Sequence, residues 1–338
     1  MSYQRADFGP LRDTVYGIGF HWTTWTWSRN GAPKPFEEAV ECFDVPQFVE
    51  QARACGAGHV LLTATHEKHH LPGPNPEVDR ILPGRTCQRD LVGEIADALG
   101  KFGIRFMVYY NHGVHHATWD PDQPQDPAWQ QAVGAWESGR HVALGHSGPV
   151  PDRSRFYDNY CRVIGWMGEH YRDKLTAFWF DSGYELAKFR DMPWERFTAA
   201  AKAGHPQRLV AYNAGIMMQH AYTSHQDYWA GELNGLAFQP FDQPATAAGL
   251  PWYAYCSWAN CDRYWQAVEW GMNATNHDRK WPEQDPQAIA NVINGFRRCG
   301  GAITFNLLCY QDGSAHPSDL ATMAKVRRIV RGGKGCCA

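Results

Sequence analysis

The chain has 338 residues, of which 44% are hydrophobic and 20% charged, and its formal net charge is −3. This composition can supply a large core, which excludes a disordered chain, and the nearly neutral charge argues against nucleic-acid or anionic-membrane partners. No apolar run approaches the roughly 20 residues that span a bilayer, so no membrane segment is expected.

The amino terminus and the 10 cysteines both indicate a cytoplasmic setting. The opening residues, MSYQRADFGPLRD, lack the basic and apolar regions of a secretory signal. The cysteines are scattered through mostly apolar stretches, and no CxxC pair has metal-ligand spacing. We therefore expect reduced thiols, no metal and no cofactor; the sequence predicts no oligomeric state.

Strand and helix patterns alternate along the whole chain. Short apolar runs predict eight buried strands, at residues 15–20, 60–64, 105–110, 177–180, 209–212, 235–238, 252–257 and 303–307. Helical spacing and capping residues predict helices between them, at residues 44–56, 91–103, 156–171, 289–299 and 317–330. On the second of these helices, Leu91, Ile95, Leu99 and Phe102 share one face.

This alternation predicts a single (β/α)₈ barrel domain, of the TIM-like α/β class, over residues 1–338. A doubly wound parallel sheet is the alternative. No GxGxxG turn follows an early strand, which argues against a dinucleotide-binding fold. The segment after the third strand runs for roughly 40 residues rich in Asp, Pro, His and Gly, a length that favours a functional loop.

The fourth strand ends in a carboxylate, in the sequence Phe178-Trp179-Phe180-Asp181. Barrel enzymes place their chemistry at the carboxyl ends of the strands. A carboxylate beside three aromatic residues is expensive to bury unless it has partners or a function. Asp181 is therefore a candidate catalytic residue, with a satisfied structural aspartate as the alternative.

Other strands also end in polar side chains, which a barrel would bring to one face. They are His21-Trp22, His66-Glu67, Asn111-His112, Asn213, Asp227 and Glu232 near the sixth strand, Trp258, and Asn306. The ring lacks the Lys and Arg clamps of a phosphate site, and it resembles a carbohydrate pocket. The 15 tryptophans cluster near strand ends; they either pack the core or stack on a sugar ring.

The segment His66-Glu67-Lys68-His69-His70 formally matches the zinc motif HExxH. That motif needs its histidines one turn apart on a helix, whereas here a strand precedes it and Pro72, Pro74 and Pro76 follow. We expect no helix and no metal. His69 and His70 are predicted to be solvated loop residues, and His66 a ligand of the substrate.

With a metal site not expected, the candidate catalytic groups are a pair of carboxylates, which glycoside hydrolysis requires. The chain also resembles the retaining α-L-fucosidase family over most of its length. Matching segments are residues 43–48, 56–58 and 60–66, Phe106 to Tyr110 with the family's sugar-site tyrosine, Trp179-Phe180-Asp181 as the nucleophile motif, and Gly300-Gly301 with Asn306 and Asp312-Gly313. His21-Trp22 resembles the family's His-Trp-Gly.

The chain departs from the family pattern at four points. Glu67 stands where the family has a second histidine, Ser182 replaces the glycine after the nucleophile, and Ala214 falls where an arginine is usual. A β-sandwich normally follows the barrel, and none is expected here. The resemblance thus implies the retaining mechanism more directly than it implies which sugar the enzyme binds.

The resemblance implies a retaining exo-glycoside hydrolase that acts on an α-L-fucoside or a related small glycoside. Asp181 would be the nucleophile and Glu232 the acid/base, with Glu185 and Asp227 as the other candidates. The expected substrate-binding residues are His21, Trp22, His66, Glu67, Tyr109, His112, Trp179, Asn213, Trp258 and Asn306. The alternatives are a metal-dependent sugar isomerase or hydrolase, with His66, Glu67, Asp181 and His112 as ligands, and a non-catalytic carbohydrate-binding barrel.

Overall fold

The fold is seen in a computed structural model of the chain. The structure describes residues 3–66, 68–113, 126–137, 140–141, 152–181, 183–187, 189, 191–216, 220–234, 236, 245–246, 248–257 and 285–332. Within them, no helix is both long and apolar enough to cross a membrane.

The described residues form a closed barrel of eight parallel strands, in the order β1-β10-β9-β8-β7-β6-β3-β2. The strands are β1 Tyr16–Phe20, β2 His59–Thr65, β3 Arg105–Tyr110, β6 Ala177–Phe180, β7 Leu209–Ile216, β8 Trp229–Asn234, β9 Trp252–Ser257 and β10 Ala302–Leu307. The barrel closes where β1 pairs with β10, with Ile18 opposite Phe305. The predicted (β/α)₈ barrel is confirmed.

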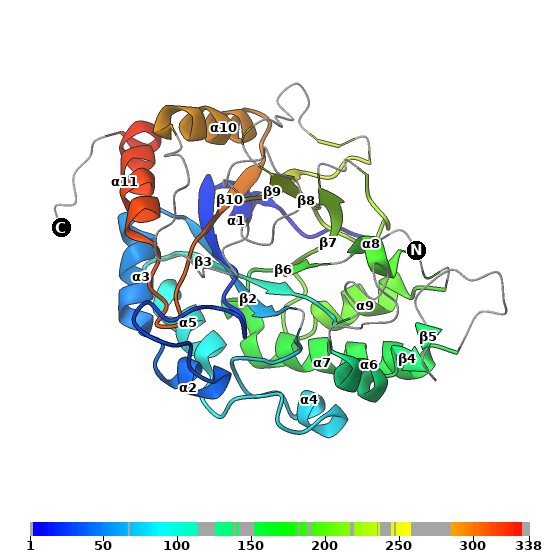
Figure 1. Ribbon diagram of the computed structural model, residues 1–338. Helices are drawn as coiled ribbons and strands as arrows, with labels where there is room; N and C mark the ends of the chain where they lie inside the picture. Colours follow the sequence, from blue (N-terminus) through cyan, green and yellow to red (C-terminus); the bar gives the residue numbers. More distant parts are fainter. Residues whose placement is uncertain are drawn as a thin grey trace.

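Helices surround the strands, which lie at the centre of Figure 1. They are α2 Phe36–Glu41, α3 Val45–Ala54, α4 Pro76–Ile81, α5 Leu91–Gly100, α6 Pro127–Val133, α7 Ser154–Tyr171, α8 Gly183–Leu186, α9 Trp194–Ala201, α10 Pro286–Arg298 and α11 Pro317–Arg331. Two short strands, β4 Trp136–Glu137 and β5 Arg140–His141, pair outside the barrel. They and α6 fall within the segment that the sequence predicts to be a long loop.

Side chains alternate between the two faces of each strand, and this alternation positions the site. On β6, Phe178 and Phe180 belong to the core between barrel and helices, while Ala177 and Trp179 belong to the barrel interior. Asp181 continues the inward set at the carboxyl end of that strand. The same alternation aims Asn213 inward from β7.

The amino-terminal segment closes the opposite end of the barrel. α1 (Gly9–Arg12) lies across this end, and Ala6, Phe8 and Leu11 pack with interior residues such as Leu209. Barrels of this type place their active sites at the other end, at the carboxyl ends of the strands.

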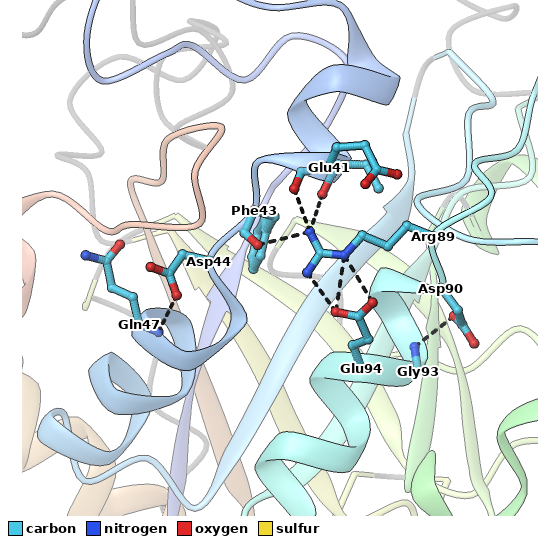
Figure 2. A network of polar contacts seen from close by, with 9 residues as sticks. Glu41, Phe43, Asp44, Gln47, Arg89, Asp90, Gly93 and Glu94 are labelled. Atoms are coloured by element: carbon cyan, nitrogen blue, oxygen red, sulfur yellow. Dashed lines mark hydrogen bonds and ion pairs between the residues drawn. The ribbon is translucent and has the colours of Figure 1, made fainter.

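Outside the barrel, side chains cap two helices, and Arg89 connects the segments around them (Figure 2). Asp44 caps α3 by accepting from the Gln47 amide, and Asp90 caps α5 by accepting from the Gly93 amide, each at 2.9 Å. Arg89 lies between these two helix starts. Its guanidinium donates to the Phe43 carbonyl at 3.1 Å and to Glu94 Oε2 at 2.7 Å, which ties α5 to the end of α2.

Two local predictions are wrong. The sixth strand is Trp229–Asn234, so Glu232 lies on the strand itself, and most of the predicted range 235–238 lies outside the described residues. The second predicted helix ends at Gly100, and Phe102 beyond it is 52% exposed, so this residue does not share the buried face.

Candidate active site

Three side chains from the described part of the chain donate to Asp181 at the carboxyl end of β6. Its Oδ2 accepts from the Tyr109 hydroxyl at 2.6 Å and from Asn111 Nδ2 at 2.9 Å. Its Oδ1 accepts from Asn213 Nδ2 at 2.9 Å. Because all three donate to the carboxylate, they favour its ionised form.

Glu232 lies beside Asp181, on the inward face of β8. Its Oε1 accepts from Asn213 Nδ2, the same nitrogen that donates to Asp181. Because a hydrogen bond spans about 3 Å, two oxygens bonded to one nitrogen lie within about 6 Å of each other. The structure thus brings the two predicted carboxylates together.

The two carboxyl groups have different environments. Burial of the Glu232 carboxyl and the neighbouring charge of Asp181 raise its pKa to about 8, while the hydrogen bond from Asn213 opposes this rise. The raised pKa favours the protonated form of Glu232 beside Asp181. Such a pair has one group equipped to donate a proton and one equipped to attack as a nucleophile.

The other two acidic candidates lie at opposite ends of the barrel. Asp227 is at the amino-terminal end of the barrel, where it accepts from the Val210 and Ala6 amides at 2.8 Å each and pairs with Lys202. It cannot reach the carboxyl-end chemistry and is structural. Glu185 is buried in α8, directly after β6.

His21 presents a hydrogen-bond acceptor to the barrel mouth. The Tyr255 hydroxyl donates to Asn306 Oδ1 at 2.6 Å, so its oxygen accepts from His21 Nδ1 at 2.9 Å. Burial and the neighbouring His66 lower the pKa of His21 to about 3, which keeps the ring neutral. With the proton on Nδ1, Nε2 has a lone pair for a hydroxyl donor.

His66, Tyr109 and Trp179 form a continuous aromatic wall with His21. The His66 ring stacks on Tyr109 with centroids 5.9 Å apart, and Tyr109 stacks on Trp179 at 5.0 Å. Trp179 is buried below Asp181, and its Nε1 has no hydrogen-bond partner among the described groups. Of these residues, His66 and His21 lie nearest the end of the strands.

Trp22 points away from the site. It is buried in the outer core against Phe43, with its Nε1 donating to the Gln311 carbonyl at 3.2 Å. Strand alternation is the reason, since it follows the inward-facing His21. His112 packs beside Tyr160 of α7, with ring centroids 5.7 Å apart. Burial lowers the pKa of His112, and the nearby Asp181 opposes this shift.

Glu67 and Trp258 lie outside the described residues. The alternative metal set includes Glu67, so it stays untested. Among the residues that the structure does describe, no three His, Cys, Asp or Glu side chains are grouped to hold a metal ion.

The prediction for His69 is wrong. Its side chain is fully buried, its ring stacks on Trp129 with centroids 3.7 Å apart, and its Nε2 lies 2.7 Å from the Tyr110 hydroxyl. The backbone amide of His69 donates to Asp126, which also forms an ion pair with Arg85. These contacts hold the segment around His69 against the protein interior. His70 is half-buried.

Ala214 follows the inward-facing Asn213 on β7 and is buried. It lies within the stretch where the pairing of β7 with β8 shifts register.

Two residues of the site were not among the predicted ligands. Asn111 donates to Asp181, and Tyr255 holds His21 and Asn306. The position of Asn111 after the third strand could have identified it, because it precedes His112 in the same polar pair. Tyr255 lies inside a strand that reads as uniformly apolar, and no local signal marks it.

Comparison with known proteins identifies a matching family. A family model described as alpha-L-fucosidase matches residues 9–326. A Caenorhabditis elegans protein named "Putative alpha-L-fucosidase" is 22% identical over 319 residues, which cover 72% of this chain and 59% of that protein. The chain thus spans a little over half the length of this curated relative.

Solved structures with the same fold include two bacterial α-L-fucosidases. Isoenzyme 1 from Paenibacillus thiaminolyticus has 17% identity and a TM-score of 0.65, covering 96% of this chain and 75% of the other. An enzyme from Bacteroides thetaiotaomicron, trapped as a covalent intermediate with 2-fluoro-fucosyl fluoride, has 16% identity and a TM-score of 0.64, covering 99% and 77%.

Proposed function

The chain belongs to the α-L-fucosidase family, and we propose that it is a retaining exo-glycoside hydrolase acting on an α-L-fucoside or a closely related glycoside. The observation that supports this most is the carboxylate pair joined by Asn213. A retaining pair is about 5 to 5.5 Å apart, whereas an inverting pair needs about 6.5 to 9.5 Å for an intervening water. The bound of about 6 Å set by the shared nitrogen favours the retaining class.

In the first half-reaction, an oxygen of Asp181 attacks the anomeric carbon. The bond from that carbon to the leaving oxygen breaks, and Glu232 gives its proton to the departing alcohol. The raised pKa of Glu232 keeps that proton available at neutral pH. The product is a glycosyl ester on Asp181.

In the second half-reaction, Glu232 is ionised and takes a proton from water. The water oxygen attacks the anomeric carbon, the ester bond to Asp181 breaks, and the sugar leaves with its original configuration. Glu232 is protonated again and Asp181 is again ionised, so the cycle closes without a cofactor.

The ring around the pair supports a sugar as the ligand. His21 and His66 lie side by side, with ring centroids 5.6 Å apart. The neutral His21 ring and the aromatic faces suit hydroxyl groups and the apolar face of a pyranose. The covalent intermediate trapped in the Bacteroides enzyme supports the double-displacement proposal by analogy of fold.

A panel of aryl glycosides with varied sugars tests the activity. We expect turnover of the aryl α-L-fucoside or of a glycoside with a related hydroxyl pattern. A 2-fluoro glycosyl fluoride of the preferred sugar should then inactivate the enzyme and add one sugar mass to the peptide that contains Asp181. Release of the inverted anomer by proton NMR would exclude the retaining mechanism.

Asp181→Asn is the matched variant. It should fold normally, lower kcat by several powers of ten and gain no sugar mass. Sugar binding with no turnover of any leaving group by the unmodified protein would instead favour a binding function.

A further inference from the structure

Asn213 is fully buried on β7 and has a fixed amide orientation. Its Oδ1 accepts from the Gly215 backbone amide at 2.9 Å, so its NH₂ group must face the carboxylates. One hydrogen serves Asp181 Oδ1 and the other serves Glu232 Oε1. Both donors of the amide are therefore used within the catalytic pair.

The local backbone maintains this arrangement. The pairing between β7 and β8 shifts register between Asn213 and Ile216, and Gly215 has a φ of +98° that side-chain-bearing residues rarely adopt. The resulting bulge turns the Gly215 amide back onto the Asn213 carbonyl. The strand thus orients the amide before any ligand arrives.

We propose that Asn213 is a positioning residue that couples the nucleophile to the acid/base through one amide nitrogen, and that it does not read the sugar. The proposal rests on the proposed function for the roles of Asp181 and Glu232. It replaces the expectation that Asn213 binds substrate.

The coupling has an electrostatic consequence at each half of the cycle. With Asp181 ionised, the Asn213 amide separates two carboxyl groups that would otherwise repel or share a proton directly. Once Asp181 is esterified its charge is gone, and the same amide stabilises the ionised Glu232 that must accept a proton from water. One donor group thus serves both protonation states of Glu232.

Among the residues that the structure describes, three titratable groups face Glu232. Asp181 acts on it by charge, and Tyr109 and Tyr255 approach it from β3 and β9. Burial raises the pKa of both tyrosines well above the usual value, so neither ionises in the working range. Removal of the Asn213 donor should therefore move the Glu232 titration upward.

The test variant is Asn213→Ser, which removes the donor to both Asp181 and Glu232. The matched control is Asn111→Ser, because Asn111 donates to Asp181. The Glu232 titration is followed by ¹³C NMR of protein labelled at the glutamate carboxyl carbons, assigned by loss of its signal in Glu232→Gln. We expect Asn213→Ser to raise the Glu232 pKa by about one unit, a tenfold gain in proton affinity, and Asn111→Ser to move it less.

With an aryl substrate, the alkaline limb of kcat/KM should shift upward by the same amount in Asn213→Ser, and kcat should fall more than KM rises. Asn213→Asp is a second, nearly isosteric variant that removes the donor and should shift the titration in the same direction. An unmoved Glu232 titration in a folded Asn213 variant, or an equal shift in Asn111→Ser, overturns the inference. Because the NMR titration needs no substrate, it is independent of a failure to turn over glycosides.

Discussion

At the scale of single residues, the site gives two carboxyl groups opposite environments. Asp181 receives donors from Tyr109, Asn111 and Asn213, which stabilise its charge. Glu232 is desolvated and lies beside that charge, which disfavours a second ionisation. In the proposed mechanism, this difference in environment, and not a difference in chemical type, separates the roles of nucleophile and proton donor.

Leaving-group dependence checks the role of Glu232. Glu232→Ala should react almost normally with good leaving groups in the glycosylation step and should be crippled with poor ones, because only poor leaving groups need protonation. Added azide should then restore turnover by replacing the base-activated water, and the azide product should keep the substrate's configuration. A uniform loss across leaving groups would instead move the role to Glu185.

The raised pKa of Glu232 also predicts a pH-dependent stability. The unfolded carboxyl releases its proton near pH 4.5 and the folded one near 8, so folding stability falls as pH rises through this window. Glu232→Gln removes the titration. Its free energy of unfolding should match that of the parent near pH 4 and exceed it by a few kcal/mol near pH 9.

Denaturant unfolding at the two pH values measures this difference. Glu195→Gln, at an exposed position in α9, is the control and should give the same small offset at both. If the Glu232→Gln offset does not grow with pH, the carboxyl of Glu232 is not held neutral by the fold.

The sequence predicted the residues that follow strand ends better than the direction in which they point. His21, His66, Asn213 and Asn306 were expected at the barrel mouth from their positions alone. Trp22 was not distinguishable from its inward neighbour, because a shift of one residue reverses the face and the exact strand end is not visible in the sequence. The contact of Asn213 with both Asp181 and Glu232 could not be predicted, because it depends on the pairing of β7 with β6 and β8.

At the scale of the elements, small residues make room for large inward side chains. A Cβ at Gly19 of β1 would overlap the Tyr255 ring, which crosses from β9 to reach His21. A Cβ at Gly17 would meet His59 in the same way. The glycines of β1 therefore shape the interior beneath the site.

Gly19→Ala should displace the Tyr255 ring and destabilise the protein by about 1 to 3 kcal/mol. It should also lower activity, because His21 loses the hydroxyl that fixes its tautomer. Gly100→Ala is the control: a Cβ there has no neighbour within 4 Å, and in the last turn of α5 it should be neutral or slightly stabilising. Equal Tm shifts in the two variants would contradict the packing argument.

The strand prediction failed at the sixth strand, where the candidate site residue Glu232 interrupts the apolar pattern. The sixth strand carries Gly231 and the inward Glu232, so its sequence reads as less apolar than the run of residues 235–238 beyond it. A charged residue at an interior position of a strand weakens the periodic signal on which the prediction depends. The other barrel strands, with uninterrupted apolar runs, were located within a few residues.

At the scale of the whole molecule, the barrel separates the end that holds the candidate site from a structural end. Alternating strands and helices were sufficient to predict the closed (β/α)₈ topology. The amino-terminal plug was not predictable, because Ala6, Phe8 and Leu11 are too few and too irregular to reveal which surface they cover. Its attachment point is Asp227, a residue that the sequence offered as a catalytic candidate.

Asp227 should therefore affect stability and not chemistry. Its carboxylate accepts from the Ala6 and Val210 amides and pairs with Lys202 at 2.9 Å, and its side chain is buried. Asp227→Ala leaves two backbone donors and an ammonium without their partner, a loss of about 3 to 5 kcal/mol for a buried pair. Hydrogen exchange should rise first in residues 3–14, while kcat of the protein that remains folded stays near normal.

Asp227→Asn, which keeps one acceptor oxygen, should lose less stability. A large fall in kcat with unchanged Tm would return Asp227 to the list of catalytic candidates, and the closed amino-terminal end would then need a different explanation.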